Sequence, residues 1–145
     1  MTRVDFYVLE TPQAQARDKL VCRLAEKAYS MDHTIYIHTD SPEQAQHLDN
    51  LLWTFRDGSF IPHQLHDQQQ SETCPVIIGH NHEPETHSEV LINAGIDVPM
   101  FFSRFERVAE VVTQDEQQRS QARERFKFYR ERGYELETHN LSIEE

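Results

Sequence analysis

The chain has 145 residues and a formal net charge of −11, with 37% hydrophobic and 27% charged residues. Its length suits one globular domain with its own core, and no apolar run approaches the roughly 18 residues of a membrane span. An acidic surface repels nucleic acid at long range, which disfavours direct DNA binding. We therefore expect a single domain over residues 1–145 that meets DNA only indirectly.

The sequence predicts neither a signal peptide nor a disulfide framework. The opening MTRVDFYVLE has a strand-like pattern from the start and leaves no room for a signal peptide, which predicts a cytoplasmic protein. Cys22 and Cys74 lie far apart without a CxxC motif. Neither a disulfide framework nor a cysteine metal site is expected.

The first two elements are a strand and a helix. RVDFYVL at 3–9 is nearly continuously apolar, which is typical of a strand buried on both faces. Thr11 is the expected N-cap of the helix that follows, with Pro12 at its first position. HTIYIHT at 33–39 predicts a second strand.

The second helix begins with a compact signal. Ser41 is the expected N-cap, Pro42 takes the first helical position, and Gln44 completes a capping-box pattern. The segment 54–74 that follows is polar, Gln-rich at its end, and is predicted to be a loop.

The C-terminal half repeats the alternation of strands and helices. The expected elements are strands at 75–80 and 88–95, a helical turn at 98–105, a last strand at 106–113 and a basic helix at 115–132. Gly133 is well placed to end that helix. The whole pattern predicts an α/β fold, with a largely parallel central sheet and flanking helices.

Glycine positions argue against a nucleotide site. The four glycines are Gly58, Gly79, Gly95 and Gly133. None follows the first strand, where LETPQAQ occupies the turn, and neither GxGxxG nor GxxxxGK[ST] occurs. We therefore expect no nucleotide-binding glycine loop and no cofactor.

Histidines are the remaining candidates for a metal site or for catalysis. His80, His82 and His87 lie close together with two glutamates between them, but in a polar loop rather than on rigid elements. We expect an exposed connection and no metal site there, and no pairing of His63 with a thiol is supported. With no catalytic residues evident, the chain is predicted not to be an enzyme. The alternative is a nucleotide- or metal-dependent enzyme or regulator that uses this loop.

The basic helix is the main functional candidate. Residues 119–132 carry six Lys and Arg against two Glu, in an otherwise acidic chain. On a helical projection, four cations share one arc: Arg119, Arg123, Lys127 and Arg130. Beside them run Ala122, Phe126 and Tyr129. Cations without i,i+4 carboxylate partners, next to an apolar stripe, suit an acidic ligand that ends in a hydrophobe. A solvated helix face is an equally open interpretation.

An aromatic segment follows the second helix. LLWTFRDGSFIPH gathers Trp53, Phe60 and Pro62 with two further apolar side chains. Such residues form protein–protein anchors, because they bury large areas with few rotors. They could equally roof the core beneath a loop.

Taken together, these stretches resemble the chi subunit family of bacterial DNA polymerase III. The matching elements are FYVL at 6–9, LDNLLW at 48–53, SFIPHQL at 59–65, EVLIN at 89–93, FERVAEVV at 105–112 and ARERFKFYRERGYEL at 122–136. The resemblance covers nearly the whole chain. It implies a Rossmann-like fold without a nucleotide cofactor and a non-catalytic replication subunit.

The resemblance also implies two partners. The psi subunit, which links such proteins to the clamp loader, would bind at Trp53, Phe60 and Pro62, and a helicase is an alternative partner for that surface. The acidic, Pro-Phe-ended C-terminal tail of single-stranded DNA-binding protein would bind elsewhere. Its site would comprise Arg119, Arg123, Phe126, Lys127 and Arg130. The segment TQDEQQ at 113–118 is a few residues shorter than in the family.

Overall fold

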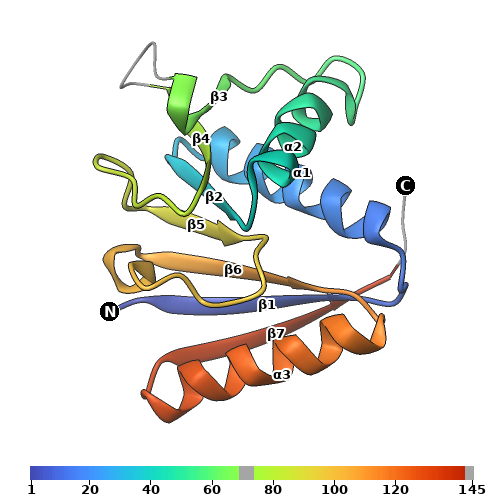
Figure 1. The fold of residues 1–145 in the computed structure, drawn as a ribbon, viewed down its shortest axis with the longest axis vertical. Coiled ribbons are helices and arrows are strands. Elements are labelled where there is room, and N and C mark those ends of the chain that lie inside the picture. Colours follow the sequence, from blue (N-terminus) through green and yellow to red (C-terminus); the bar gives the residue numbers. More distant parts are fainter. Residues whose placement is uncertain (69–73, 143–145) are drawn as a thin grey trace.

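The computed structural model describes residues 1–68 and 74–142. One open sheet runs through it, with seven strands in the order β3-β4-β2-β5-β6-β1-β7 (Figure 1). The strands are Arg3–Leu9 (β1), Ile35–Thr39 (β2), His63–Leu65 (β3), Val76–His80 (β4), Val90–Asn93 (β5), Arg107–Val112 (β6) and Glu135–Leu141 (β7). Every pairing is parallel, so the α/β prediction is confirmed and the sheet is wholly rather than largely parallel.

Helices cover both faces of the sheet. They are Ala14–Ser30 (α1), Pro42–Thr54 (α2) and Glu116–Glu131 (α3), with short 3-10 turns at His66–Gln68 (η1) and Phe102–Arg104 (η2). The first two helices pack on one face and α3 on the other (Figure 1). Successive strand residues point to opposite faces, so Tyr36 enters the α3-side core while Ile37 enters the other. Within the described residues, no helix has the length and apolarity to cross a membrane.

The connection from β6 through α3 to β7 places the basic helix over β1. This is because β1 lies between β6 and β7 in the sheet. Phe6 of β1 packs edge-on against Phe126 of α3, with ring centroids 5.2 Å apart. The fold thus sets one side of α3 on the sheet and turns the other outward.

The predicted start of the second helix is confirmed. Ser41 Oγ accepts a hydrogen bond from the Gln44 amide at 3.1 Å, and Pro42 opens α2. In a full capping box the Gln44 side chain would accept from the Ser41 amide. Here it accepts from the Asp40 amide instead and donates to the Ala94 carbonyl. The cap therefore also ties α2 to the end of β5.

The predicted start of the first helix is wrong. The helix begins at Ala14, with Gln13 as N-cap and no capping side chain. Thr11 Oγ1 instead accepts from the Gln13 amide at 3.2 Å, a side-chain turn that precedes the helix. Pro12 lies before the helix rather than in its first turn.

Two strands were not predicted. The first, β3, lies inside the expected loop 54–74, and the second, β7, follows Gly133, so the strand expected at 106–113 is not the last. Because β7 is an edge strand with a largely exposed polar sequence, it lacks the apolar run of a buried strand. The Gln-rich part of the loop, residues 69–73, lies outside the described residues.

Candidate functional site

The basic helix has well-defined ends. The Asp115 carboxylate caps its start by accepting from the Gln118 amide at 3.0 Å. Gly133 adopts φ +82° directly after the C-cap, the left-handed conformation expected of a residue that ends a helix. Local sequence alone therefore fixes the limits of α3.

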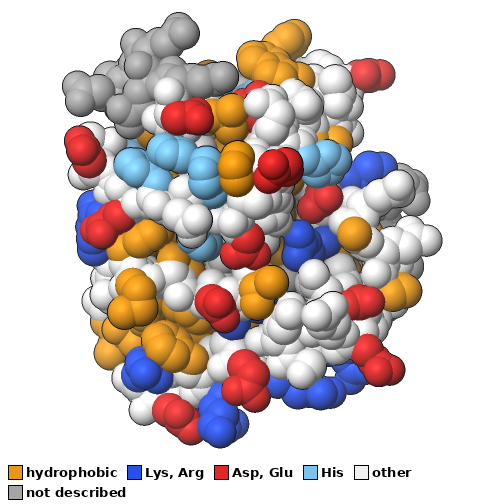
Figure 2. Space-filling model, in the orientation of Figure 1, with side chains coloured by type: hydrophobic (Ala, Val, Ile, Leu, Met, Phe, Trp, Pro, Cys, Tyr) orange, Lys and Arg blue, Asp and Glu red, His pale blue; other side chains and the backbone are white. Residues whose placement is uncertain are grey.

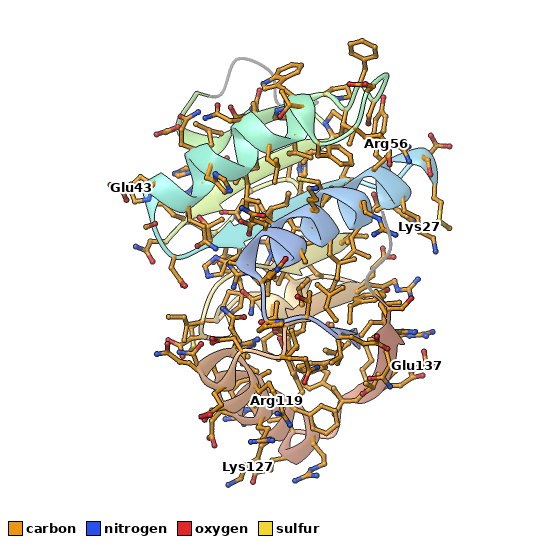
Figure 3. The ribbon with its side chains drawn as sticks, turned by 90° about the vertical axis from the view of Figure 1, so that its right-hand side faces the viewer. Lys27, Glu43, Arg56, Arg119, Lys127 and Glu137 are labelled. Carbon is orange, nitrogen blue, oxygen red and sulfur yellow. The ribbon has the colours of Figure 1, made fainter. Side chains whose placement is uncertain are left out.

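The four predicted cations of α3 all lie on its exposed side. Figure 3 shows Arg119 and Lys127 on this helix, at the opposite end of the molecule from Glu43 and Arg56. Lys127 Nζ lies 3.9 Å from the Glu131 carboxylate, so the expectation that no i,i+4 partner exists is wrong at Lys127. The other three, Arg119, Arg123 and Arg130, form no ion pair with any residue that the structure describes.

An open pocket of about 190 Å³ lies between α3 and the strands beneath it. Its lining consists of Phe6, Val8, Val112, Gln114, Arg119, Ala122, Arg123, Phe126 and Thr138. The floor is apolar and two guanidinium-bearing residues belong to the rim. Three predicted site residues thus meet at one pocket, while Lys127 and Arg130 lie further along the helix. Arg130 stays close, with its guanidinium carbon 5.9 Å from the Phe126 ring centroid.

The short segment before α3 takes part in this pocket. Its Gln114 lines the cavity and donates from Nε2 to the Leu9 carbonyl at 2.8 Å. The Gln114 amide also bonds the Thr11 carbonyl at 2.9 Å. The segment is therefore tied to the end of β1, and the pocket stays open beside it.

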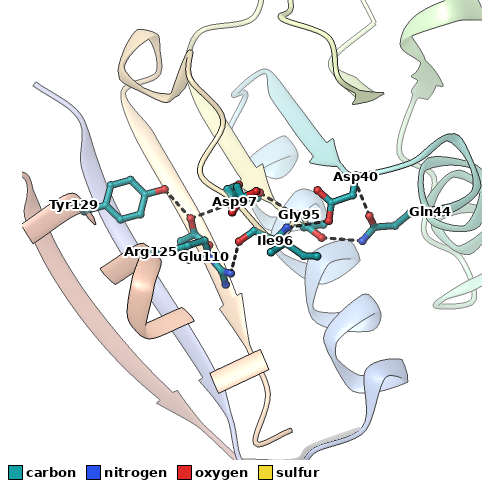
Figure 4. Close-up of polar contacts among 10 residues, drawn as sticks. Asp40, Gln44, Gly95, Ile96, Asp97, Glu110, Arg125 and Tyr129 are labelled. Carbon is teal, nitrogen blue, oxygen red and sulfur yellow. Dashed lines mark hydrogen bonds and ion pairs between the residues drawn. The ribbon is translucent and has the colours of Figure 1, made fainter. Parts of the chain in front are cut away.

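A buried carboxylate, which no sequence pattern indicated, holds α3 on the sheet. Glu110 of β6 has no exposed surface and accepts from Arg125 Nε at 2.7 Å and from the Tyr129 hydroxyl at 2.6 Å (Figure 4). Asn93 Nδ2 donates to the same carboxylate at 2.9 Å. Burial, and then the Glu110 charge, raise the pKa of Tyr129. Arg125, one of the helix's cations, is therefore structural.

The same network continues to the start of α2. Arg125 Nη1 donates to the Ile96 carbonyl at 2.8 Å, and the Ile96 amide donates to Asp40 at 2.9 Å (Figure 4). Asn93 accepts from the Gly95 amide at 2.9 Å. These bonds fix the connection after β5, so α3 and the N-terminal end of α2 are joined through the carboxyl ends of the central strands.

The aromatic segment forms a second exposed surface. Trp53 is 57% exposed and Phe60 81%, and Pro62 is exposed beside them, whereas Ile61 is buried. The Trp53 ring lies 4.3 Å, centroid to centroid, from the ring of buried His63. The alternative that these residues roof the core therefore holds for Ile61 but is wrong for Trp53 and Phe60.

The thiols and His87 are structural. Cys22 is buried, and burial raises its pKa to about 12, while burial also raises the pKa of Cys74. A thiol held protonated in this way is a poor nucleophile. His87 is buried with Nε2 2.8 Å from the Cys74 carbonyl oxygen, so the expectation of an exposed histidine connection is wrong at this residue.

Fold and surface together define a parallel α/β protein of the Rossmann-like kind without a glycine loop. The chain superposes on the crystal structure of T4 UvsW with a TM-score of 0.71. That match has 8% sequence identity and covers 97% of this chain and 42% of the other, so it concerns the fold alone.

Sequence comparison is more specific. The family model described as DNA polymerase III chi subunit, HolC, matches residues 1–137. The chain is 43% identical over 141 residues to the DNA polymerase III subunit chi of Pseudomonas aeruginosa, covering 97% of this chain and 98% of the relative. It is 28% identical over 143 residues to that of Escherichia coli K12, with 95% and 97% covered. The chain therefore belongs to the DNA polymerase III chi subunit family, whose members are accessory subunits of DNA replication.

Breaking the buried ion pair should cost far more than removing an exposed cation of the same helix. Arg125→Met removes the cationic partner of the enclosed Glu110 carboxylate, so we expect a loss of about 3–5 kcal/mol in the free energy of unfolding. Lys127→Met should change it by less than about 0.5 kcal/mol. Urea denaturation at pH 7.5 measures both. Equal effects of the two substitutions would show that the Glu110 contacts do not anchor α3.

Stability should also fall in mild acid because of His38. This buried residue lies near the end of β2, and burial lowers its pKa below 6.5 despite the opposing effect of the Asp40 carboxylate. A lowered folded-state pKa means that stability is fully present above pH 6.5 and is lost as the pH falls toward the folded value. Comparing urea denaturation of wild type and His38→Gln at pH 7.5 and 5.5 isolates this effect. The wild type should lose more stability than the variant; a difference independent of pH would contradict the assignment.

Proposed function

We propose that this chain is a non-catalytic adaptor of DNA replication. The exposed cations of α3 and the pocket beside them bind the acidic C-terminal tail of single-stranded DNA-binding protein. The exposed side chains of Trp53, Phe60 and Pro62 bind the psi subunit, which connects the chain to the clamp loader in the cytoplasm. Membership of the chi family supports the replication setting. The observation that carries the proposal is the apolar pocket bordered by Arg119 and Arg123.

The pocket suits a peptide that ends in phenylalanine. Phe6, Ala122 and Phe126 offer an apolar lining for an aromatic ring. Arg119 and Arg123, without ion-pair partners in the described part of the chain, can each bind a carboxylate in bidentate fashion. Exposed cations further along α3 steer an acidic segment. A short peptide bound this way should have a dissociation constant on the order of micromolar, about −8 kcal/mol.

The second surface suits a stable partner. Trp53 and Phe60 expose large rings at the end of α2 and in the segment after it. Rigid aromatic anchors of this kind carry much of the binding energy at protein interfaces. Psi is the occupant we propose, and a helicase could compete for the same rings. Because the two described thiols have raised pKa values, an enzymatic role based on them is disfavoured.

Tail binding should depend on one arginine of α3. Isothermal titration with an acidic peptide ending in Asp-Ile-Pro-Phe should give micromolar affinity for the wild type. Arg123→Ala should weaken binding at least about tenfold, because it removes a guanidinium group that binds a peptide carboxylate. Removal of the terminal Phe should have an effect of the same size, because it removes the ring that fills the apolar pocket. Arg132→Ala is the matched control, since Arg132 stacks on Phe128 at the far end of the same helix. Equal weakening by Arg123→Ala and Arg132→Ala would show only a general charge effect, and no binding at low salt would refute tail recognition.

Psi binding should depend on Trp53 and not on α3. Trp53→Ala should weaken a psi complex by about 2 kcal/mol or more, roughly thirtyfold, as expected when an interface anchor is truncated. Met100→Ala is the control, because Met100 is an apolar side chain 92% exposed on another part of the surface. Size-exclusion chromatography and fluorescence titration with purified psi measure the change. Unaltered psi affinity in both Trp53→Ala and Phe60→Ala would move the interface elsewhere without affecting the tail proposal.

A further inference from the structure

One buried imidazole joins the two parts of the aromatic surface. His63 opens β3, and its side chain has no exposed surface. Its Nδ1 lies 2.7 Å from the Ile61 carbonyl oxygen, and its Nε2 lies 3.0 Å from the Asp49 carbonyl oxygen. Ile61 belongs to the segment after α2 that exposes Phe60, whereas Asp49 lies on α2, one turn before Trp53. The ring therefore contacts both segments that build the surface.

Both ring nitrogens of His63 face oxygens that can only accept a hydrogen bond. A neutral imidazole carries one N–H group, so its other nitrogen would direct a lone pair at a carbonyl oxygen in either tautomer. An imidazolium carries two N–H groups and donates to both carbonyls. Because the side chain is enclosed, an unmade hydrogen bond here costs free energy that solvent does not return. The geometry thus favours the charged ring.

The surroundings of the ring compensate this charge. Asp49 Oδ1 lies 3.5 Å from Nε2 of His63. Burial raises the pKa of Asp49, and the His63 charge opposes that rise. The Trp53 ring has its centroid 4.3 Å from that of His63, and an aromatic ring at such a distance attracts a cation. The neighbour on β4 is the apolar Val76, so within the described chain the compensating charge comes from α2.

His87 shows that two close partners do not by themselves require a charged ring. Its Nε2 lies 2.8 Å from the Cys74 carbonyl oxygen, and its Nδ1 lies 3.0 Å from the Thr86 hydroxyl. A hydroxyl both donates and accepts, so a neutral ring that donates from Nε2 satisfies both contacts. His63 has two carbonyl partners instead, and only a second proton satisfies both of them.

We propose that His63 is held as an imidazolium and positions Trp53 and Phe60 for psi, on the basis that psi binds these residues as proposed above. Figure 2 shows hydrophobic side chains at the top of the molecule, where the segment after α2 lies in Figure 1. By donating to the carbonyls of Asp49 and Ile61, the charged ring holds that segment against α2 before a partner arrives. A surface ordered in advance loses less entropy on binding. Loss of the proton as the pH rises removes one of the two bonds, so psi binding weakens.

The emission of Trp53 reports the state of the ring directly, because Trp53 is the only tryptophan of the chain. An imidazolium quenches a neighbouring indole more strongly than a neutral imidazole does. Emission at pH 7.0 should therefore be weaker in the wild type than in His63→Gln, and it should rise toward the value of the variant by pH 9.0. His47→Gln is the matched control, an exposed histidine of α2 that pairs with Asp18, and should behave as wild type.

Affinity for purified psi at the same two pH values tests the positioning role. At pH 7.0, His63→Gln should bind psi at least about tenfold more weakly than the wild type, and at pH 9.0 the difference should shrink to about threefold or less. Comparing the ratio of the two affinities cancels any titration within psi. A purely structural role of His63 would weaken binding by the same factor at both pH values.

Histidine-selective ¹⁵N NMR of the wild type needs no substitution, so it decides the case even where a variant fails to fold. We expect two N–H groups on the His63 ring at pH 7.0. A single N–H group there would overturn the proposal, and so would an affinity ratio that does not change with pH. Failure of the wild type to bind psi at either pH would overturn the proposed partner. The NMR and emission measurements would then still decide whether a charged His63 holds Trp53.

Discussion

The carboxylate of Glu110 is enclosed between the sheet and α3, and the placement of the basic helix depends on it. Burying a carboxylate away from water costs free energy unless hydrogen-bond donors surround it. Here Arg125, Tyr129 and Asn93 donate three hydrogen bonds to it. Two of these partners are on α3, at positions four residues apart on one face. The contacts therefore fix the rotation of the helix, and with it which cations turn outward and which aromatic ring borders the pocket.

This constraint sorts the six cations of residues 119–132 by role. Arg125 serves the buried carboxylate, Arg132 stacks with its guanidinium carbon 3.6 Å from the Phe128 ring centroid, and Lys127 pairs with Glu131. Arg119, Arg123 and Arg130 remain without an ion pair in the described chain. The charge available to a ligand is thus smaller than the net charge of the segment, and it is concentrated beside the pocket.

The topology separates the two proposed docking surfaces. α3 lies over β1 near one edge of the sheet, whereas α2 packs near β3 and β4 at the other edge (Figure 1). The proposed sites at Trp53 and at Arg123 therefore lie on separate parts of the molecule, which suits an adaptor that binds two proteins. The hydrogen bonds from Arg125 through Ile96 to Asp40 hold the connection after β5 between α3 and the start of α2. The fold therefore sets the distance between the two surfaces.

The sequence determined the elements whose signals are local. The apolar runs of β1, β2, β4, β5 and β6, the cap at Ser41 and the helix end at Gly133 were predicted from a few neighbouring residues. Tertiary structure decided what depends on distant partners. The polar strand β7 forms because β1 offers it a free edge, and Glu110 and Arg125 are buried because they meet across the core. His66 joins His80 only because β3 pairs with β4. Sequence patterns record short-range propensity and hydrophobic period, whereas buried charge pairs and edge strands are stabilised by contacts far apart in the chain.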